Sequence, residues 1–394
     1  MKTEIKINIK SLALLSLFIY NIAMYLVLHN TPILLIFIVF ASMYILTYKK
    51  IYFEKSMLLF VLFFFIICVS FFGSMDKSSA LSVIQLLLKY YVFCVLVYLI
   101  INTKDSFDFA IFSLCWSGIV MSIYAFYYYG FSFIFFAIAN GIRLGTEINQ
   151  VNAFGLYSAI SFAICIYYAL LQGKKKYYLI SLLPLFTVLA SSSRKAIFIV
   201  LLSIFVFQIA RNKIKKIYIT LILITILIIL FQQALTLPYM ANVNERLTGV
   251  FGLFTGEGDV DNSTAMRKRL IELGITYFKE SPLIGHGTGS YRFLTQSVFG
   301  VQTASHNNYI ELLVNYGLVG FISYYSVYIY LIYKLYMMVK KGDNDAILLL
   351  FFQIITLFLI DIAMISYLNG ITYMILGITI AYLKINREKK LKEI

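Results

Sequence analysis

The residues of this chain that could carry chemistry are arginines and histidines in separate polar segments. Three such segments stand out: GIRLGTEINQVN at 141–152, SSSRKA at 191–196 and the long stretch 238–309. The planar guanidinium group of arginine can grip a phosphate or carboxylate through two hydrogen bonds. Histidine can accept a proton near neutral pH, because its unperturbed pKa is about 6.5. Arg143, Arg194, Arg267 and His306 therefore predict a site for an anionic ligand with a general base beside it.

The composition of the chain is that of a polytopic membrane protein. It has 394 residues, of which 61% are hydrophobic and 13% are charged. Apolar runs occur throughout, and a run of such length can cross the roughly 30 Å hydrocarbon core of a bilayer as a helix. We therefore expect an all-α fold with about twelve transmembrane helices. The expected spans are 11–28, 32–47, 57–73, 80–102, 109–129, 151–171, 178–192, 196–210, 217–237, 310–336, 346–365 and 371–384.

The basic residues orient these spans. With the N-terminus in the cytoplasm, 22 of the 33 Lys and Arg residues fall in inner loops and tails, as the positive-inside rule requires. Both termini are then cytoplasmic, and six of the eight arginines and all three histidines lie outside. The net charge of +15 is mostly a topology signal and not a sign of nucleic-acid binding. The predicted parts are spans one to nine at 1–237, one large extracytoplasmic loop at 238–309, and the last three spans with a cytoplasmic tail at 310–394.

One helix is expected inside the large outer loop. The run TAMRKRLIELGITYFKESP at 264–282 is amphipathic and stops at Pro282. Its apolar face contains Leu270, Leu273, Ile275 and Phe278. A helix of this kind beside a membrane is expected to lie against the outer leaflet.

Each polar motif also has a purely structural interpretation. His306 could serve as the cap of the helix that follows, a role that Ser305 or Asn307 also suits. The segment GHGTGSY at 285–291 lacks the surroundings of a phosphate-binding loop and is, taken alone, a flexible turn. The three serines at 191–193 have no nucleophile-elbow glycines and are interpreted as a polar turn. Cys68, Cys94, Cys115 and Cys165 all lie in apolar spans and predict small core residues.

In combination, however, these motifs resemble a known family. The run His306-Asn307-Asn308-Tyr309 followed by Gly317 and Gly320 is similar to the HNxY…GxxG signature of the O-antigen ligase/polymerase family. Arg267, fifteen residues before Pro282, followed by Gly285 and Gly287, looks like its Arg…P-x-x-G-x-G segment.

Two further segments carry the resemblance toward the N-terminus. The turn SRKA at 193–196 resembles the family's SRGA turn, with Lys in place of Gly. The segment RLGT at 143–146 with Asn152 is similar to its RxxGTxxNPN segment, although the first interval is shorter here and the proline is missing.

The resemblance implies an all-helical glycosyltransferase of GT-C type in the bacterial cytoplasmic membrane, with its active site on the outer side. Its donor would be a glycan linked to undecaprenyl diphosphate, and its acceptor a glycan or a second lipid-linked glycan. Membrane lipid is a further expected partner and a chain-length regulator an optional one. No nucleic acid, cofactor or metal is expected.

The chemistry of such a transfer assigns the residues. Arg143, Arg194 and Arg267 are predicted to bind the diphosphate, whose negative charge grows as it leaves. His306 is the predicted catalytic base that takes the proton of the acceptor hydroxyl. Secondary candidates for the site are Arg269, His286, Glu147, Asn307 and Tyr309.

Three functions remain open. We favour a polymerase that extends lipid-linked repeat units, because the outer loop has no second domain for a large acceptor. The alternative is a ligase that transfers finished glycan to lipid A–core or another acceptor. Less favoured is a transporter or flippase of lipid-linked saccharide, which would need a midplane site and interrupted helices. The charges inside spans, Lys89 and Asp361, are predicted to pair with each other.

Overall fold

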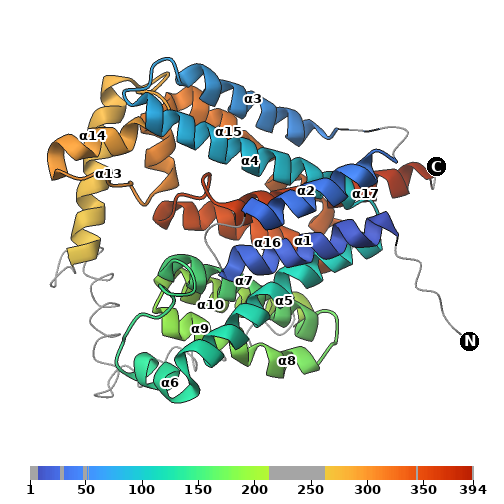
Figure 1. Ribbon diagram of the computed structural model, residues 1–394. Coiled ribbons are helices and arrows are strands. Elements are labelled where there is room, and N and C mark those ends of the chain that lie inside the picture. The colour runs from blue at the N-terminus through green and yellow to red at the C-terminus, as the bar shows by residue number, and fades with distance from the viewer. Residues whose placement is uncertain are drawn as a thin grey trace, which may run out of the picture. The chain divides into compact units, whose positions relative to one another are not determined.

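Helix is the only regular secondary structure in the residues that the computed structural model describes (Figure 1). The described residues are 8–26, 31–47, 51, 53–212, 262–342 and 345–392. They divide into two compact units, each described by itself. Unit 1 combines 1–44 with 108–260, and unit 2 combines 45–107 with 261–394.

Unit 1 is built around one buried helix, α7 (Val151–Leu170). In its apolar stretch, 94% of the residues are buried. Its small and hydroxyl-bearing residues allow neighbouring helices to approach closely. For example, a Cβ on Gly155 would overlap the side chain of Ser191. The helices of this unit are α1 (Ile9–Leu26), α2 (Thr31–Ile45), α5 (Lys104–Tyr129, from Asp108), α6 (Phe131–Ala139), α7, α8 (Lys176–Ile180), α9 (Leu182–Ser191) and α10 (Arg194–Asn212).

Unit 2 is built around the long helix α15 (Asn308–Lys340), which packs against α3, α13 and α16, while α17 packs against α4. The buried side chains between them include many tyrosines. The ring of Tyr316, for example, packs edge to face on Phe63 and Tyr367, and the Tyr325 hydroxyl donates to Asp361 Oδ2. The other elements of this unit are α3 (Lys55–Ser70), α4 (Lys77–Ile100), α13 (Asn262–Glu280), α14 (Ser290–Phe299), α16 (Asp345–Ile360), the 3-10 turn η2 (Asp361–Ala363) and α17 (Gly370–Lys392).

The chain is a polytopic all-α membrane protein. Among the residues that the structure describes, six helical segments are long and apolar enough to cross a bilayer: α1, α4, α5, α7, α15 and α16 with η2. Shorter apolar helices occupy 31–45, 55–70 and 176–191. Every predicted span that falls on described residues coincides with helix, whereas the predicted span 217–237 lies outside them. The count of twelve crossings stays a prediction.

Helix α15 is interrupted at Gly317. This residue has φ 61° and ψ −164°, a conformation that glycine adopts without strain, and a Cβ there would overlap the backbone of Leu283. The segment 282–287 supplies partners for the backbone groups that the break frees. Four hydrogen bonds join the two: Leu318 N to Pro282 O (2.8 Å), Val319 N to Leu283 O (3.1 Å), His286 N to Val314 O (2.8 Å) and Gly287 N to Asn315 O (2.9 Å).

Beyond the break, α15 carries an apolar stripe that faces outward. Its exposed members are Leu318, Val319, Ile322, Ile329, Tyr333, Tyr336 and Met337. Most of these positions follow steps of three, four or seven residues, so they share one face of the helix. In a membrane protein, such a face meets lipid.

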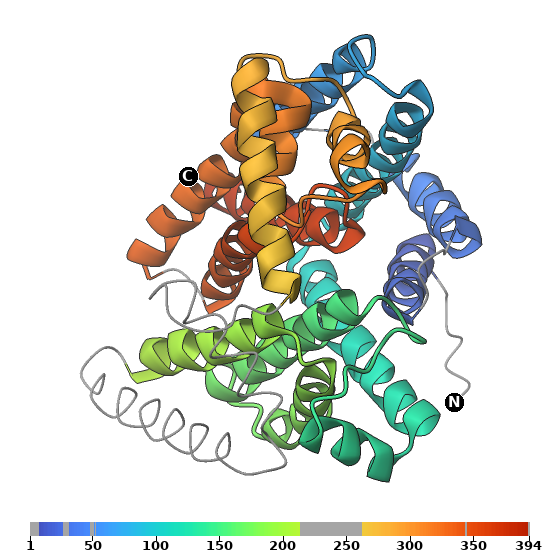
Figure 2. The ribbon, with the colours of Figure 1, turned by 90° about the vertical axis from the view of Figure 1, so that its left-hand side faces the viewer.

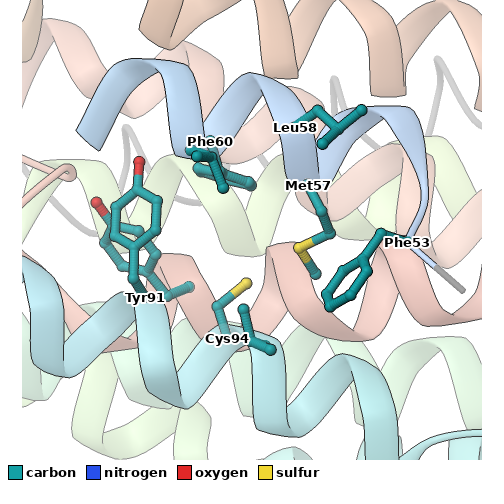
Figure 3. A pocket seen from close by; sticks show the side chains of 9 residues that line it. Phe53, Met57, Leu58, Phe60, Tyr91 and Cys94 are labelled. Atoms are coloured by element: carbon teal, nitrogen blue, oxygen red, sulfur yellow. The ribbon is translucent and has the colours of Figure 1, made fainter. Parts of the chain in front are cut away.

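An apolar cavity of about 210 Å³ lies in unit 2 between α3, α4 and α17 (Figure 3). Phe53, Met57, Leu58, Phe60, Tyr91 and Cys94 line it together with Val61, Val95 and Tyr373. None of the candidate site residues is among them. The cavity offers almost no polar lining to a charged donor, so the chemistry has to be sought elsewhere.

Candidate functional site

The turn that carries His306 is fixed by the residues around it. Asn307 is the N-cap of α15, and its Oδ1 accepts a hydrogen bond from Ile310 N at 3.1 Å. The capping role that could explain His306 therefore belongs to Asn307. His306 is half-buried and has φ 54°, a left-handed conformation that few residues other than glycine adopt. Such a conformation persists where the surrounding structure enforces it.

Ser305 and Glu311 complete this turn. Ser305 N donates to Glu311 Oε2 at 3.0 Å, and Asn307 N donates to Ser305 Oγ at 3.1 Å. The Ser305 hydroxyl in turn donates to Asn307 O at 2.7 Å. Glu311 is only 2% exposed, and its carboxylate finds the backbone donor that a buried acceptor requires. The contribution of Glu311 was missed in the sequence, because it depends on how residues 305–307 turn into the first turn of α15.

Asn308 anchors the same turn inside the helix bundle. Its Nδ2 donates to Tyr325 Oη at 2.9 Å and to Asp361 Oδ2 at 3.1 Å, and its Oδ1 accepts from Tyr367 N at 3.1 Å. Tyr325 Oη also donates to Asp361 Oδ2, at 2.8 Å. Both Asn308 and Asp361 are fully buried. Asp361 thus supports the His306 turn through Asn308, which follows His306 by two residues.

The predicted ion pair of Lys89 with Asp361 is wrong. Asp361 takes its hydrogen bonds from Asn308 and Tyr325, and within the described part of the chain no salt bridge joins it to Lys89. The physical reason is that neutral donors can bind a buried carboxylate oxygen, here Oδ2, without requiring a second charge to be desolvated. Lys89 is itself only half-buried.

Tyr309, a secondary candidate, also has an anchoring contact. Its hydroxyl donates to Phe358 O at 2.5 Å, and its ring stacks on Tyr325 with centroids 4.9 Å apart. Tyr309 and the two asparagines before it therefore make bonds within the protein that hold the turn in place.

Helix α13 brings Arg267 to the same end of unit 2. Helix α13, the yellow helix of Figure 2, packs against α15. A Cβ on Gly274 would overlap Ile310, and Pro282 accepts from Leu318 N. Each of these pairs is 36 positions apart in the sequence, so position 270 of α13 is level with His306.

Arg267 lies on the side of α13 that faces α15. Arg267, Leu270 and Gly274 are spaced by three and four residues and share one helical face. Leu270 is 1% exposed and Arg267 is half-buried, whereas Lys268 and Arg269 are exposed. The principal candidate Arg267 thus lies on the packed side of α13, and the secondary candidate Arg269 lies on its exposed side.

The expected helix at 264–282 is confirmed as α13, but its packed face differs from the predicted one. The face runs through Leu270 and Gly274 and packs against α15, while Ile275 is 42% exposed. Gly274 was missed because a glycine has no apolar side chain to mark it as buried. Here it lets two helices approach where a larger residue would separate them.

The segment after α13 is docked and not a flexible turn. Besides its bonds to α15, Thr288 O accepts from Ser74 Oγ at 2.6 Å, and Thr288 Oγ1 donates to Ile67 O at 2.9 Å. A Cβ on Gly287 would overlap the backbone of Ser74. His286 Nε2 donates to Tyr277 O at 2.7 Å. This bond occupies Nε2 with a proton, because a carbonyl can only accept.

In unit 1, Arg143 and Arg194 belong to one local arrangement. Arg143 Nε donates to Ser191 O at 3.2 Å, and its Nη2 donates to Asn152 Oδ1 at 3.0 Å. Ser192 closes α9 with φ 48°, and α10 begins at Arg194. The polar turn predicted at 191–193 is confirmed, and Arg143 is bonded to the turn from which Arg194 projects.

The neighbouring candidate Glu147 is held by a tyrosine. Tyr129 Oη donates to Glu147 Oε2 and accepts from Gly145 N at 3.0 Å. Gly145 has φ 120°, and a Cβ there would lie 2.6 Å from the ring of Phe154. Leu144, buried with Ala190, fixes the same loop against α9 through its N–H, which donates to Ala190 O at 2.9 Å.

The four principal candidates thus form two pairs. Arg143 bonds to the turn that precedes Arg194 in unit 1, and Arg267 and His306 lie at one end of unit 2. The predicted convergence of all four on one ligand stays a prediction.

A comparison with protein families matches the part of the chain that carries three of the four principal candidates. Residues 179–325 match the family described as O-antigen ligase. The matched segment contains Arg194, Arg267 and His306 and begins after Arg143. Among curated proteins, none matches the chain.

Proposed function

We propose that this protein, whose residues 179–325 match the family described as O-antigen ligase, is the polymerase of a bacterial surface polysaccharide. It would transfer a growing glycan from undecaprenyl diphosphate onto another lipid-linked repeat unit. The product would be an O-antigen, a capsule or an exopolysaccharide. The observation that supports the proposal is the fixed turn that carries His306, which is level with position 270 of α13, one helical turn from Arg267.

In the proposed reaction, the acceptor hydroxyl oxygen attacks the anomeric carbon of the donor sugar. The bond from that carbon to the diphosphate oxygen breaks, and undecaprenyl diphosphate leaves with the electron pair. His306 accepts the hydroxyl proton. The guanidinium groups of Arg267, Arg194 and Arg143 stabilise the negative charge that develops on the leaving group. The step needs no metal or cofactor.

The proposed site lies on the outer side of the cytoplasmic membrane, where an exported lipid-linked donor presents its diphosphate at the headgroup level. The positive-inside rule supports this side for residues 262–309 and puts both termini in the cytoplasm. Membrane lipid surrounds the donor there, and a chain-length regulator is an optional partner.

A polymerase is favoured over a ligase by the described part of the outer loop. Residues 262–309 form α13, α14 and their connections, and α13 and α14 pack on α15. This part therefore contains no separate domain for a large acceptor such as lipid A–core. The ligase remains the alternative within the same family.

The break in α15 favours a second candidate, a transporter of lipid-linked saccharide, because transporters bind substrates at interrupted helices. At such a site the freed backbone groups face the substrate. Here the segment 282–287 bonds to Val314 O, Asn315 O, Leu318 N and Val319 N. Those groups are thus occupied by the protein itself, which argues for the transferase.

The decisive experiment supplies purified protein with lipid-linked repeat units and no other acceptor. A ladder of longer lipid-linked glycans is the expected product. Ladder formation that starts only after lipid A–core is added would replace the polymerase by the ligase. If repeat units instead cross vesicle membranes without elongation, the transporter is correct.

A further inference from the structure

Two large apolar side chains project from the loop that joins α13 to α14. Leu283 is 64% exposed and Ile284 is 72% exposed. They follow the exposed charged residues Lys279 and Glu280 at the end of α13. Adjacent aliphatic residues with this exposure on a polar loop indicate an interaction surface.

The loop presents this pair on a rigid support. Pro282 and Leu283 accept from the first N–H groups of the second half of α15. The Ser281 hydroxyl donates to Gly285 O at 2.9 Å and closes the turn around Leu283 and Ile284. Because these bonds leave the loop little freedom, the two side chains protrude at a fixed level of α15.

That level coincides with the start of the lipid-facing stripe of α15. The stripe runs from Leu318 to Met337, and at 1.5 Å per residue its length is about 28 Å. This matches the roughly 30 Å hydrocarbon core of a bilayer. The preceding half-helix carries the buried polar residues Asn308, Glu311 and Asn315 instead. The edge of the hydrocarbon therefore falls near Leu318, the residue bonded to Pro282.

We propose that Leu283 and Ile284 insert into the edge of the bilayer hydrocarbon and act as a membrane wedge. The partner of this surface is lipid, because the pair is continuous with exposed Leu318, Val319 and Ile322 on a membrane-spanning helix. Lys279 and Glu280 remain at the level of the headgroups. The wedge fixes the height of α13 relative to the membrane. It depends on membrane embedding alone and not on the proposed glycosyl transfer.

Tryptophan fluorescence measures this depth directly. The chain has a single tryptophan, Trp116, so Trp116→Phe provides a background into which one reporter is placed. Ile284→Trp is the test position, in the full-length protein reconstituted in vesicles of phosphatidylcholine brominated at defined depths. Two controls bracket it: Gln302→Trp on an exposed polar segment and Ile329→Trp in the middle of the lipid-facing stripe.

We expect Ile284→Trp to be quenched several-fold more by bromines near the headgroups than by bromines near the chain ends. Its emission should lie to the blue of Gln302→Trp, and Ile329→Trp should show the opposite depth preference. Iodide in the buffer should quench Gln302→Trp more than Ile284→Trp. Emission and iodide quenching of Ile284→Trp equal to those of Gln302→Trp would overturn the wedge. Protection from both bromine and iodide would also overturn it, and would indicate a protein partner. Neither result depends on whether the protein transfers sugar.

Discussion

The two units hold their candidate residues in opposite ways. In unit 2, His306 is held by its neighbours, because Asn307, Ser305 and Glu311 make the bonds that shape its turn. In unit 1, Arg143 makes such bonds itself and donates to Ser191 O and Asn152 Oδ1.

The difference lies in what fixes each residue. The backbone of His306 is shaped by bonds between its neighbours, whereas Arg143 itself bonds to the turn that precedes Arg194. A guanidinium group that donates to protein acceptors also contributes to the position of its neighbours. Under the proposed function, we expect His306, Arg194 and Arg267 to act on the reacting groups, and Arg143 both to contact the leaving group and to position the turn that precedes Arg194.

The largest effect is expected for His306. His306→Ala should slow glycan elongation about 10²–10⁴-fold, the usual contribution of general base catalysis. Binding of the lipid diphosphate donor should persist, because the arginines are unchanged. The wild-type elongation rate should also fall as acid protonates the imidazole, since only neutral histidine accepts a proton. This acid-side fall in rate should be absent in the variant. Loss of donor binding with normal turnover at saturating donor would make His306 a ligand contact instead.

Arg267 and Arg269 form a matched pair on α13. Arg267→Lys should reduce elongation by about 10²–10³-fold, as loss of one transition-state donor does, because lysine cannot reproduce the two-pronged contact. Arg269→Lys, at an exposed position on the same helix, should retain most activity. Steady-state rates at equal protein insertion give the comparison. Equal losses in both variants would remove the distinction drawn from the α13–α15 packing.

The sequence predicted the membrane class, most helix positions and the polar turn at 191–193, because apolar runs and turn residues are local signals. It also singled out His306. It could not assign the cap of α15, because Ser305, His306 and Asn307 all suit that role by composition and only backbone geometry separates them. Asp361 was paired with the wrong residue, since its partners Asn308 and Tyr325 are distant in the chain. Contacts of this kind have no periodic signature.

The support beneath the His306 turn can be tested with Asn308 and Asp361. Asn308→Ala and Asp361→Ala should each destabilise the protein, and the double variant should lose less than the sum. For residues in contact, such coupling is about 0.5–3 kcal/mol. The free energy of unfolding in detergent micelles measures it. Lys89→Ala combined with Asp361→Ala is the control and should be additive. Coupling in the control and additivity in the test pair would restore the ion pair.

A smaller effect is expected at the arginine turn of unit 1. Arg143→Lys cannot reproduce both hydrogen bonds and should lose about 0.5–1.5 kcal/mol of stability per bond before any discount for exposure. Because Arg143 is exposed, solvent screening should keep the loss at the lower end. Arg194→Lys should reduce elongation more than it reduces stability. The reverse pattern would exchange the two roles.

The smallest expected effect concerns the N-cap of α4. The segment just before this cap bonds to the docked loop of unit 2 through Ser74 and Met75. The Asp76 carboxylate accepts from the Ser79 hydroxyl, from Ser79 N at 3.3 Å and from Ser78 N at 3.0 Å. These bonds, led by that of the Ser79 hydroxyl, lower the pKa of Asp76 from 3.8. A lowered pKa adds stability at pH values above 3.8, and this stability is lost as pH falls through the folded-state pKa. The Tm difference between wild type and Asp76→Asn should therefore shrink as the pH falls below about 4. Arg143 and a lysine in its place both stay charged over that range, so the Tm difference between wild type and Arg143→Lys should stay constant. A parallel acid response at both positions would mean that the two turns do not differ in how charge supports them.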